Sequence, residues 1–201
     1  MVADAVLKLV LLGSGIAAVL GAYGLWLWGR SRRTQVSLAD TATAAWEDCA
    51  PPSAQLTVEM DSDLAVSADP EKLAALFEAL FENSVEYGGR DVTVRLFRTG
   101  DGFAVADDGP GIPPDDRTQI FELGHSTRAD RQGLGLGLVR TLCRAYGWDV
   151  AVVGPADEQS GGSGGERRSL SGTRVVVSDV RFYSTWETDD GEPVSGADAS
   201  A

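Results

Sequence analysis

The stretch DPEKLAALFEALFENSVEYG, residues 69–88, predicts the best-defined helix of the chain. Asp69 is a good N-cap, and Pro70 suits the first helical position. Apolar side chains recur along one face at steps of three and four residues, and a glycine pair ends the helix. Asn83 lies at the edge of that apolar face. A half-buried carboxamide needs hydrogen-bond partners, so Asn83 is a candidate site residue, although backbone or water could equally satisfy it.

The residues on either side of this helix alternate between strand and helix patterns. Period-two or continuous apolar runs predict strands, and runs with period 3.6 predict helices. We expect the segment 64–67 to be a short partner of the strand 55–60. The order predicts an α/β fold, a two-layer sandwich with helices on one face of a mixed, largely antiparallel sheet. The strands are expected at 55–60, 64–67, 92–96, 103–106, 150–153 and 173–178, and two further helices at 38–49 and 135–145.

Two polar and glycine-rich segments stand out between these elements. Asp107-Asp108-Gly109-Pro110-Gly111 follows a predicted strand. An aspartate at that place can accept a hydrogen bond from an exocyclic amine, and glycines let the backbone approach a flat ligand closely. The same residue pairs are also common in ordinary turns.

The second segment is Gly133-Leu134-Gly135-Leu136-Gly137-Leu138, which opens a predicted helix. Backbone N–H groups at a helix N-terminus bind phosphate, helped by the helix dipole. No Gly-Lys-Ser/Thr follows, so the segment is not a P-loop, and its spacing does not fit a dinucleotide fold. Glycine for close packing is the alternative explanation.

Taken in order, these segments resemble the nucleotide-binding boxes of histidine kinases. Residues 76–88 are similar to the asparagine box, and Asp107 to Pro113 resemble the first glycine box. Residues 121–127 look like the phenylalanine box, and 133–138 look like the second glycine box. Ser171-Gly172-Thr173 resembles the final Gly-Thr element. The resemblance covers about residues 36 to 180, and the wider superfamily includes gyrase-type and chaperone-type ATPases.

This resemblance implies ATP and Mg²⁺ as ligands. Asn83 would ligate Mg²⁺, which prefers hard oxygen donors, and Asp107 would read the adenine amine. The segment 113–132 would act as a lid, with Ser126, Thr127, Arg128 or Arg131 near the phosphates. The residues implied in ATP binding are Asn83, Tyr87, Asp107, Gly109, Gly111, Ser126, Thr127, Gly133, Gly135, Gly137, Leu138 and Thr173.

The implied function is two-component signalling, in which the γ-phosphoryl group passes to a histidine on a partner or onward to a response regulator. Two features depart from the family pattern. Ala79 stands where many of these kinases carry a second asparagine. His125 is the sole histidine and lies in the predicted lid, where we interpret it as a lid or packing residue. The alternatives are an ATP-sensing module without turnover, a truncated kinase, and a serine/threonine kinase of the same superfamily.

The segment Leu9–Trp28 carries no charge and predicts a membrane anchor. At about 1.5 Å per residue, it would span roughly 30 Å, the thickness of a bilayer core. Arginines at 30, 32 and 33 follow it, so the positive-inside rule places the remainder in the cytoplasm. A cleaved signal peptide is the competing interpretation, but its positive charge normally precedes the apolar run. Small residues at 13, 17 and 21 could support a homodimer, or reflect the abundance of glycine in membrane helices.

The sequence therefore predicts a single-pass cell-membrane protein. The expected segments are an extracytoplasmic N-terminus at 1–8, the helix at 9–28, a linker at 29–37, an ATP-binding domain at 38–183 and an acidic disordered tail at 184–201. A net charge of −13 argues against nucleic-acid binding, which needs a basic surface. The two cysteines, Cys49 and Cys143, are not spaced as metal ligands.

Overall fold

The computed structural model describes residues 32–117, 119–121, 135–154 and 172–184. All of the elements described here belong to the unit Thr34–Ala201. The expected N-terminus, membrane anchor and lid tip lie outside the described residues, as does the tail beyond Ser184. Among the residues that are described, no helix is long and apolar enough to span a membrane.

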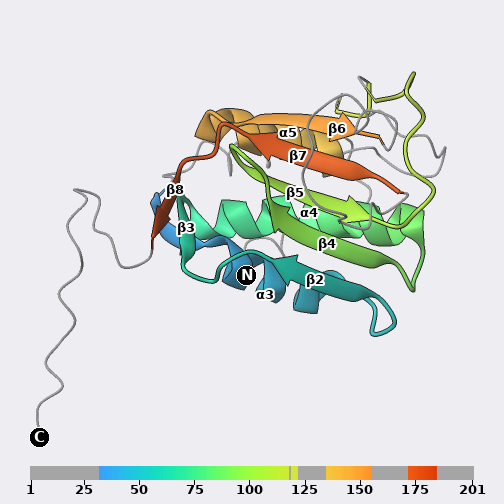
Figure 1. Ribbon diagram of the computed structural model, residues 1–201, viewed down its shortest axis with the longest axis horizontal. Coiled ribbons are helices and arrows are strands. Elements are labelled where there is room, and N and C mark those ends of the chain that lie inside the picture. The colour runs from blue at the N-terminus through green and yellow to red at the C-terminus, as the bar shows by residue number, and fades with distance from the viewer. Residues whose placement is uncertain (1–31, 118, 122–134, 155–171, 185–201) are drawn as a thin grey trace, which may run out of the picture. The chain divides into compact units, whose positions relative to one another are not determined.

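The main sheet has five strands in the order β2-β4-β5-β7-β6 (Figure 1). Strands β2 and β4 pair in parallel, and the other three pairs are antiparallel. The predicted mixed, largely antiparallel sheet is therefore confirmed. The strands are β2 (Gln55–Glu59), β4 (Thr93–Arg98), β5 (Phe103–Asp107), β6 (Asp149–Val153) and β7 (Arg174–Ser178).

Three helices cover one face of this sheet, as the sequence predicts. They are α3 (Leu38–Cys49), α4 (Pro70–Gly88) and α5 (Gly135–Tyr146). Figure 1 shows them behind the sheet, and α4 contacts both of the others. Aromatic rings fill the interior between helices and sheet. Phe77 stacks on Phe81 with their centroids 5.8 Å apart, and it lies tilted against Phe103 at a centroid distance of 5.7 Å.

The ends of α4 are fixed by local chemistry. Asp69 caps the first turn because its side chain accepts the backbone N–H groups of Glu71 and Lys72, at 3.2 and 3.4 Å. Gly89 follows the helix at a φ of 99°, a conformation that favours glycine. These caps fix the residues at which the helix begins and ends.

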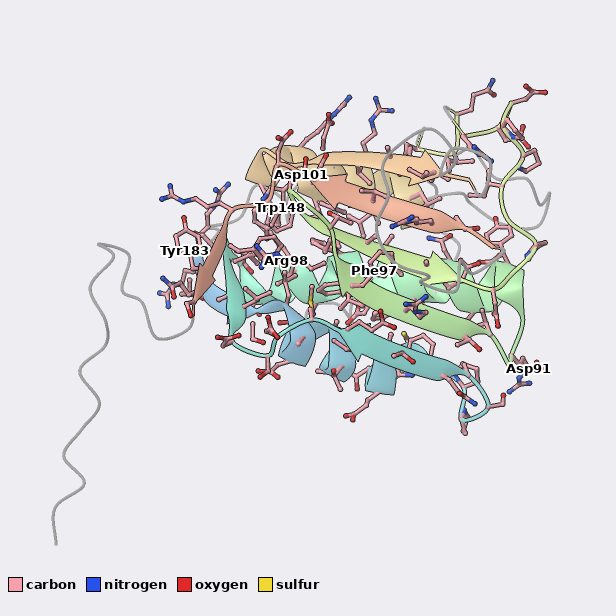
Figure 2. All side chains as sticks on the ribbon, viewed as in Figure 1. Asp91, Phe97, Arg98, Asp101, Trp148 and Tyr183 are labelled. Carbon is pink, nitrogen blue, oxygen red and sulfur yellow. The ribbon has the colours of Figure 1, made fainter. Side chains whose placement is uncertain are left out.

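The opposite face of the sheet carries a small apolar cluster of its own. Phe97, Ala104 and Ala106 are buried there, and Val176 packs against them. The guanidinium of Arg174 lies 4.8 Å from the Phe97 ring centroid, and that of Arg95 lies 5.7 Å from it. Figure 2 labels Phe97 on β4. Cation–π contacts of this kind shield an aromatic ring on an otherwise open sheet face.

The structure differs from the sequence-based expectation in a second, three-stranded sheet of order β1-β3-β8. Residues 34–37, expected in a linker, form β1 (Thr34–Ser37), which pairs antiparallel with β3 (Leu64–Ala68). We expected 64–67 to be a partner of 55–60, but β3 pairs instead with β1 and with β8 (Phe182–Ser184). Strands this short give no period-two pattern, and their pairing joins residues far apart in the chain.

Candidate functional site

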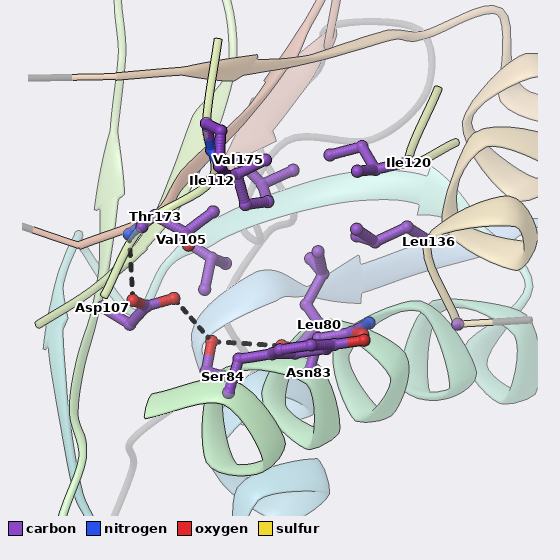
Figure 3. A pocket seen from close by; sticks show the side chains of 14 residues that line it. Leu80, Asn83, Ser84, Val105, Asp107, Ile112, Ile120, Leu136, Thr173 and Val175 are labelled. Carbon is purple, nitrogen blue, oxygen red and sulfur yellow. Dashed lines mark hydrogen bonds between the residues drawn. The ribbon is translucent and has the colours of Figure 1, made fainter. Parts of the chain in front are cut away.

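A cavity opens between α4, the end of β5, the start of α5 and β7 (Figure 3). Its volume is about 110 Å³, several times the roughly 10–15 Å³ that one water needs. Most of its wall is apolar, and its polar groups gather on α4 and at Asp107. The lining residues are Leu80, Asn83, Ser84, Tyr87, Val105, Asp107, Gly111, Ile112, Pro113, Ile120, Gly135, Leu136, Thr173 and Val175.

Asp107 is the buried acid of this cavity, with 7% of its surface exposed. Its Oδ1 accepts two backbone N–H groups, from Gly109 at 3.0 Å and from Thr173 at 2.9 Å. Its Oδ2 faces the hydroxyl of Ser84 at 3.3 Å. One carboxylate oxygen is therefore satisfied by the backbone, while the other has a single hydroxyl partner among the described residues.

The environment of Asp107 changes its acidity. Burial raises the pKa of this carboxyl above the ordinary value of 3.8, and the hydrogen bonds just described offset part of the rise. The nearby Asp108 carboxylate adds to the increase. A carboxylate kept in an apolar wall at a cost in stability is typical of functional sites.

Glycine is required beside Asp107. A Cβ on Gly172 would overlap both the main-chain carbonyl and the carboxylate of Asp107. A Cβ on Gly109 would come 2.9 Å from the Cα of Gly88 at the end of α4. The loop after β5 can therefore approach α4 and the start of β7 only because these positions lack side chains.

Asn83 sits where α4 meets the first turn of α5. Its Nδ2 donates to the carbonyl of Ala79 at 2.5 Å, and a Cβ on Gly135 would lie 2.7 Å from the same nitrogen. Because a carbonyl can only accept, this contact fixes the amide nitrogen on the backbone side. Within the described residues, Oδ1 accepts no hydrogen bond, so it remains available as an oxygen ligand.

The cavity brings together six residues that the sequence singles out. Gly109 lies beside Asp107, and both Gly137 and Leu138 lie in the first turn of α5 outside the cavity lining. Ser126, Thr127 and Gly133 lie outside the described residues, as do His125, Arg128 and Arg131. The six lining residues are Asn83, Tyr87, Asp107, Gly111, Gly135 and Thr173.

Sequence reasoning did not identify Ser84 as a site residue, although it is 6% exposed and contacts Asp107. A serine on an apolar helix stripe normally bonds the carbonyl four residues earlier, and Ser84 also does this, at 3.2 Å from the oxygen of Leu80. The one feature of the sequence that could have identified Ser84 is its position next to Asn83. The apolar residues Ile112 and Ile120 were also missed, because they lie in a segment without periodicity.

We predict that Asp107→Asn changes the pH dependence of stability. The pKa of an unfolded aspartate is about 3.9, and the pKa of Asp107 in the folded state is higher. At pH values between these two, the folded state binds more protons than the unfolded state. The unfolding free energy of the native protein therefore falls as pH rises through this window. The variant has no such proton, so its stability relative to the native protein should increase with pH and then level off. Urea midpoints measured from about pH 4 to pH 8 test this.

Asp108→Asn is the matched control, because Asp108 is exposed and Asn can still accept the N–H of Thr93, which Asp108 Oδ1 accepts at 2.8 Å. Its profile should fall with rising pH as that of the native protein does, over a slightly narrower window, because only the small contribution of Asp108 to the pKa of Asp107 is removed. Parallel pH profiles for the native protein and Asp107→Asn would contradict the buried, destabilising carboxylate.

Similarity to solved structures agrees with this fold. The mycobacterial sensor histidine kinase MprB superposes with a TM-score of 0.57 at 21% identity, over 75% of this chain and 99% of that one. The ATP binding domain of PrrB from Mycobacterium tuberculosis gives a TM-score of 0.53 at 22% identity, over 73% and 95%. At these identities the likeness establishes the fold.

Sequence relatives extend the comparison to whole proteins. The adaptive-response sensory kinase SasA of Trichormus variabilis is 33% identical over 102 residues, which is 46% of this chain and 25% of that protein. The sensor histidine kinase ZraS of Klebsiella oxytoca is 34% identical over 90 residues, which is 42% of this chain and 20% of that protein. The matched region thus spans a quarter or less of each of these relatives.

The family model described as "Histidine kinase-, DNA gyrase B-, and HSP90-like ATPase" matches residues 68–182, more than half of the chain. The match begins just before α4, ends in β8 and includes every cavity-lining residue. With the fold and the sequence relatives in agreement, the chain belongs to the histidine kinase-, DNA gyrase B- and HSP90-like ATPase family.

Proposed function

We propose that this chain is a membrane-anchored domain that binds ATP with Mg²⁺ and passes the γ-phosphoryl group to a histidine on a partner protein. The observation that carries the nucleotide part is the half-satisfied carboxylate of Asp107 at the wall of an apolar cavity. Family membership and the sensor kinases among its relatives support the signalling part.

The cavity suits a flat, mostly apolar base with one donor at its edge. Side chains of Val105, Val175 and Leu80 line it, together with two isoleucines and Leu136. Figure 3 shows Asp107 and Thr173 at one side of the space and Leu136 and Ile120 at the other. A base inserted among these side chains would bury apolar surface, while its amine could reach the Asp107 carboxylate.

The hydrogen bonding of Asp107 favours adenine over guanine. Guanine presents two adjacent donors, which pair best with two free carboxylate oxygens. Oδ1 is already occupied by the backbone N–H groups of Gly109 and Thr173, so only Oδ2 can accept from a ligand. A single exocyclic amine, as in adenine, matches that one acceptor.

Asn83 and the start of α5 would serve the phosphate end. The N-terminus of α5 offers backbone N–H groups and a favourable dipole to phosphate. Asn83 contacts its first residue, Gly135, and directs Nδ2 toward Ala79, which leaves Oδ1 for a cation. ATP held along the cavity would therefore extend from Asp107 at the base toward Asn83 at the phosphates.

The residues fit Mg²⁺ as a cation carried by the nucleotide. No group of three or more His, Cys, Asp or Glu that could hold a metal occurs among the described residues. Mg²⁺ is commonly bound by one or two protein oxygens with phosphates and waters completing its shell. Asn83 Oδ1 would supply such a protein oxygen, and the ion would neutralise phosphate charge during transfer.

A second candidate function is ATP sensing without turnover. Ala79 is 5% exposed, and its main-chain carbonyl accepts the amide of Asn83. Its methyl side chain has no group that could activate a nucleophile. Such a module would bind ATP and change the state of a partner without transferring phosphate.

Our first prediction for this function is that Asp107→Asn strongly weakens ATP binding. The Asn oxygen can still accept from Gly109 and Thr173, so the scaffold is kept, but an NH₂ group then faces the adenine amine. Loss of a charged hydrogen bond, about 1.5–3 kcal/mol, weakens affinity by roughly 10- to 150-fold. Calorimetric titration of the full chain with a non-hydrolysable ATP analogue and Mg²⁺ measures this.

Asp108→Asn serves again as the matched control and should bind like the native protein. GTP should compete only weakly. Unchanged affinity in Asp107→Asn would mean that nucleotide, if bound, does not use this cavity. Absence of binding in the folded native chain would refute the proposed function.

A second prediction concerns phosphotransfer. With γ-labelled ATP and Mg²⁺, label should move to a histidine on an added phosphoacceptor hairpin, such as that of a related sensor kinase, with release of ADP. Asn83→Ala should stop the transfer but keep adenosine binding, because the base contacts are intact. If label never leaves ATP with any hairpin while binding persists, ATP sensing becomes the supported function.

A third prediction concerns the anchor. The uncharged segment Leu9–Trp28 and the arginines after it support insertion with the ATP-binding domain in the cytoplasm. The full chain expressed in bacteria should stay with membranes after an alkaline wash, and a variant lacking residues 9–28 should not. Release of the full chain by the wash would contradict a membrane-spanning anchor.

A further inference from the structure

Arg117 lies in the turn that follows the loop after β5. The N–H of Asp116 donates to the carbonyl of Pro113 at 3.0 Å, and that of Ile120 donates to Asp116 at 3.1 Å. From this turn the Arg117 side chain folds back, and its Nε donates to the carbonyl of Ile112 at 3.1 Å. The side chain therefore holds the backbone that forms one wall of the nucleotide cavity.

The guanidinium of Arg117 also rests on the end of β6. Gly154, the residue after that strand, is buried, and a Cβ placed on it would overlap Nη2 and Cζ of Arg117. Only a glycine leaves room for the flat guanidinium there. Arg117 thus connects the Ile112 backbone on one side with the Gly154 backbone on the other.

The wall that Arg117 holds has a hollow behind it. A second cavity of about 430 Å³ is lined by Arg117, Gly154 and the last residues of β6. It shares Gly111, Ile112, Pro113 and Thr173 with the nucleotide cavity, so this loop separates the two spaces. Within the described residues, a cavity and not packed side chains lies behind this wall, so the wall lacks contacts of the kind that make interiors stiff.

We propose that Arg117 is a positioning residue that acts as a strut across the second cavity and holds Ile112 and Ile120 against the adenine base. This role rests on the proposed function, because it concerns the same nucleotide site. Arg117 itself does not line the nucleotide cavity, so it acts through the loop and not by contact with ATP.

A double-mutant cycle on the full chain tests the strut. Arg117→Ala removes it, and Gly154→Ala displaces it, because the new Cβ would take the place of the guanidinium. Each change should weaken the affinity for a non-hydrolysable ATP analogue by roughly 3- to 10-fold, the effect of losing a hydrogen-bonded contact. The double variant should lose no more than the larger single change, because both act on one contact.

Two further measurements separate positioning from general destabilisation. Adenosine affinity should fall by the same factor as that of the ATP analogue, because the wall contacts the base. Without nucleotide, the amides of Gln119 and Ile120 should exchange hydrogen faster in both variants. Gly100→Ala and Arg90→Ala are the matched controls, since a Cβ on Gly100 meets nothing within 4 Å and Arg90 is exposed. Both should bind like the native protein.

The outcomes distinguish the two proposals. If the native chain binds the analogue and Arg117→Ala binds equally well, the strut is overturned while the nucleotide site stands. Additive losses in the double variant would also overturn it, because they would show separate effects. If the folded native chain binds neither analogue nor adenosine, the proposed function fails, and the positioning role fails with it.

Discussion

The site depends on one buried carboxylate held by the backbone of two chain segments. Asp107 ends β5, and its Oδ1 accepts N–H groups from Gly109, two residues later, and from Thr173, at the entrance to β7. The antiparallel register of β5 and β7 brings these segments together, and further main-chain hydrogen bonds between Asp107 and residues 172 and 173 secure them. Gly172 packs so closely against Asp107 that a Cβ would overlap it. Because Oδ1 is held in this way, the carboxylate cannot turn, and Oδ2 points into the cavity before any ligand arrives.

The same burial that raises the pKa of Asp107 would also strengthen its hydrogen bond to the amine of the proposed nucleotide. A charged hydrogen bond is stronger where water is excluded, and a group already held in place loses little entropy on binding. Ser84 has one hydroxyl proton for two acceptors, the Leu80 carbonyl and Oδ2 of Asp107. It can therefore release Oδ2 to a ligand amine and keep its bond to the helix, which an additional backbone donor could not do.

Sequence reasoning found the elements whose signals are local. The cap at Asp69, the apolar stripe of α4 and the glycines around Asp107 identify their own segments, and the structure confirms the helices and the mixed sheet. Sequence reasoning missed β1 and β8, because their pairing with β3 joins residues far apart in the chain. It also missed the contact of Ser84 with Asp107 and that of Arg117 with Gly154, since each depends on where two elements meet.

The geometry of Asn83 bears on the meaning of Ala79. The amide of Asn83 is oriented by the main-chain carbonyl of Ala79, which any residue at that position would supply. Alanine at this position therefore leaves intact the orientation of Asn83, the proposed Mg²⁺ ligand. What alanine cannot do is position or activate a water molecule for attack on the γ-phosphate. This favours a reaction in which the nucleophile comes from a partner over hydrolysis by the domain alone.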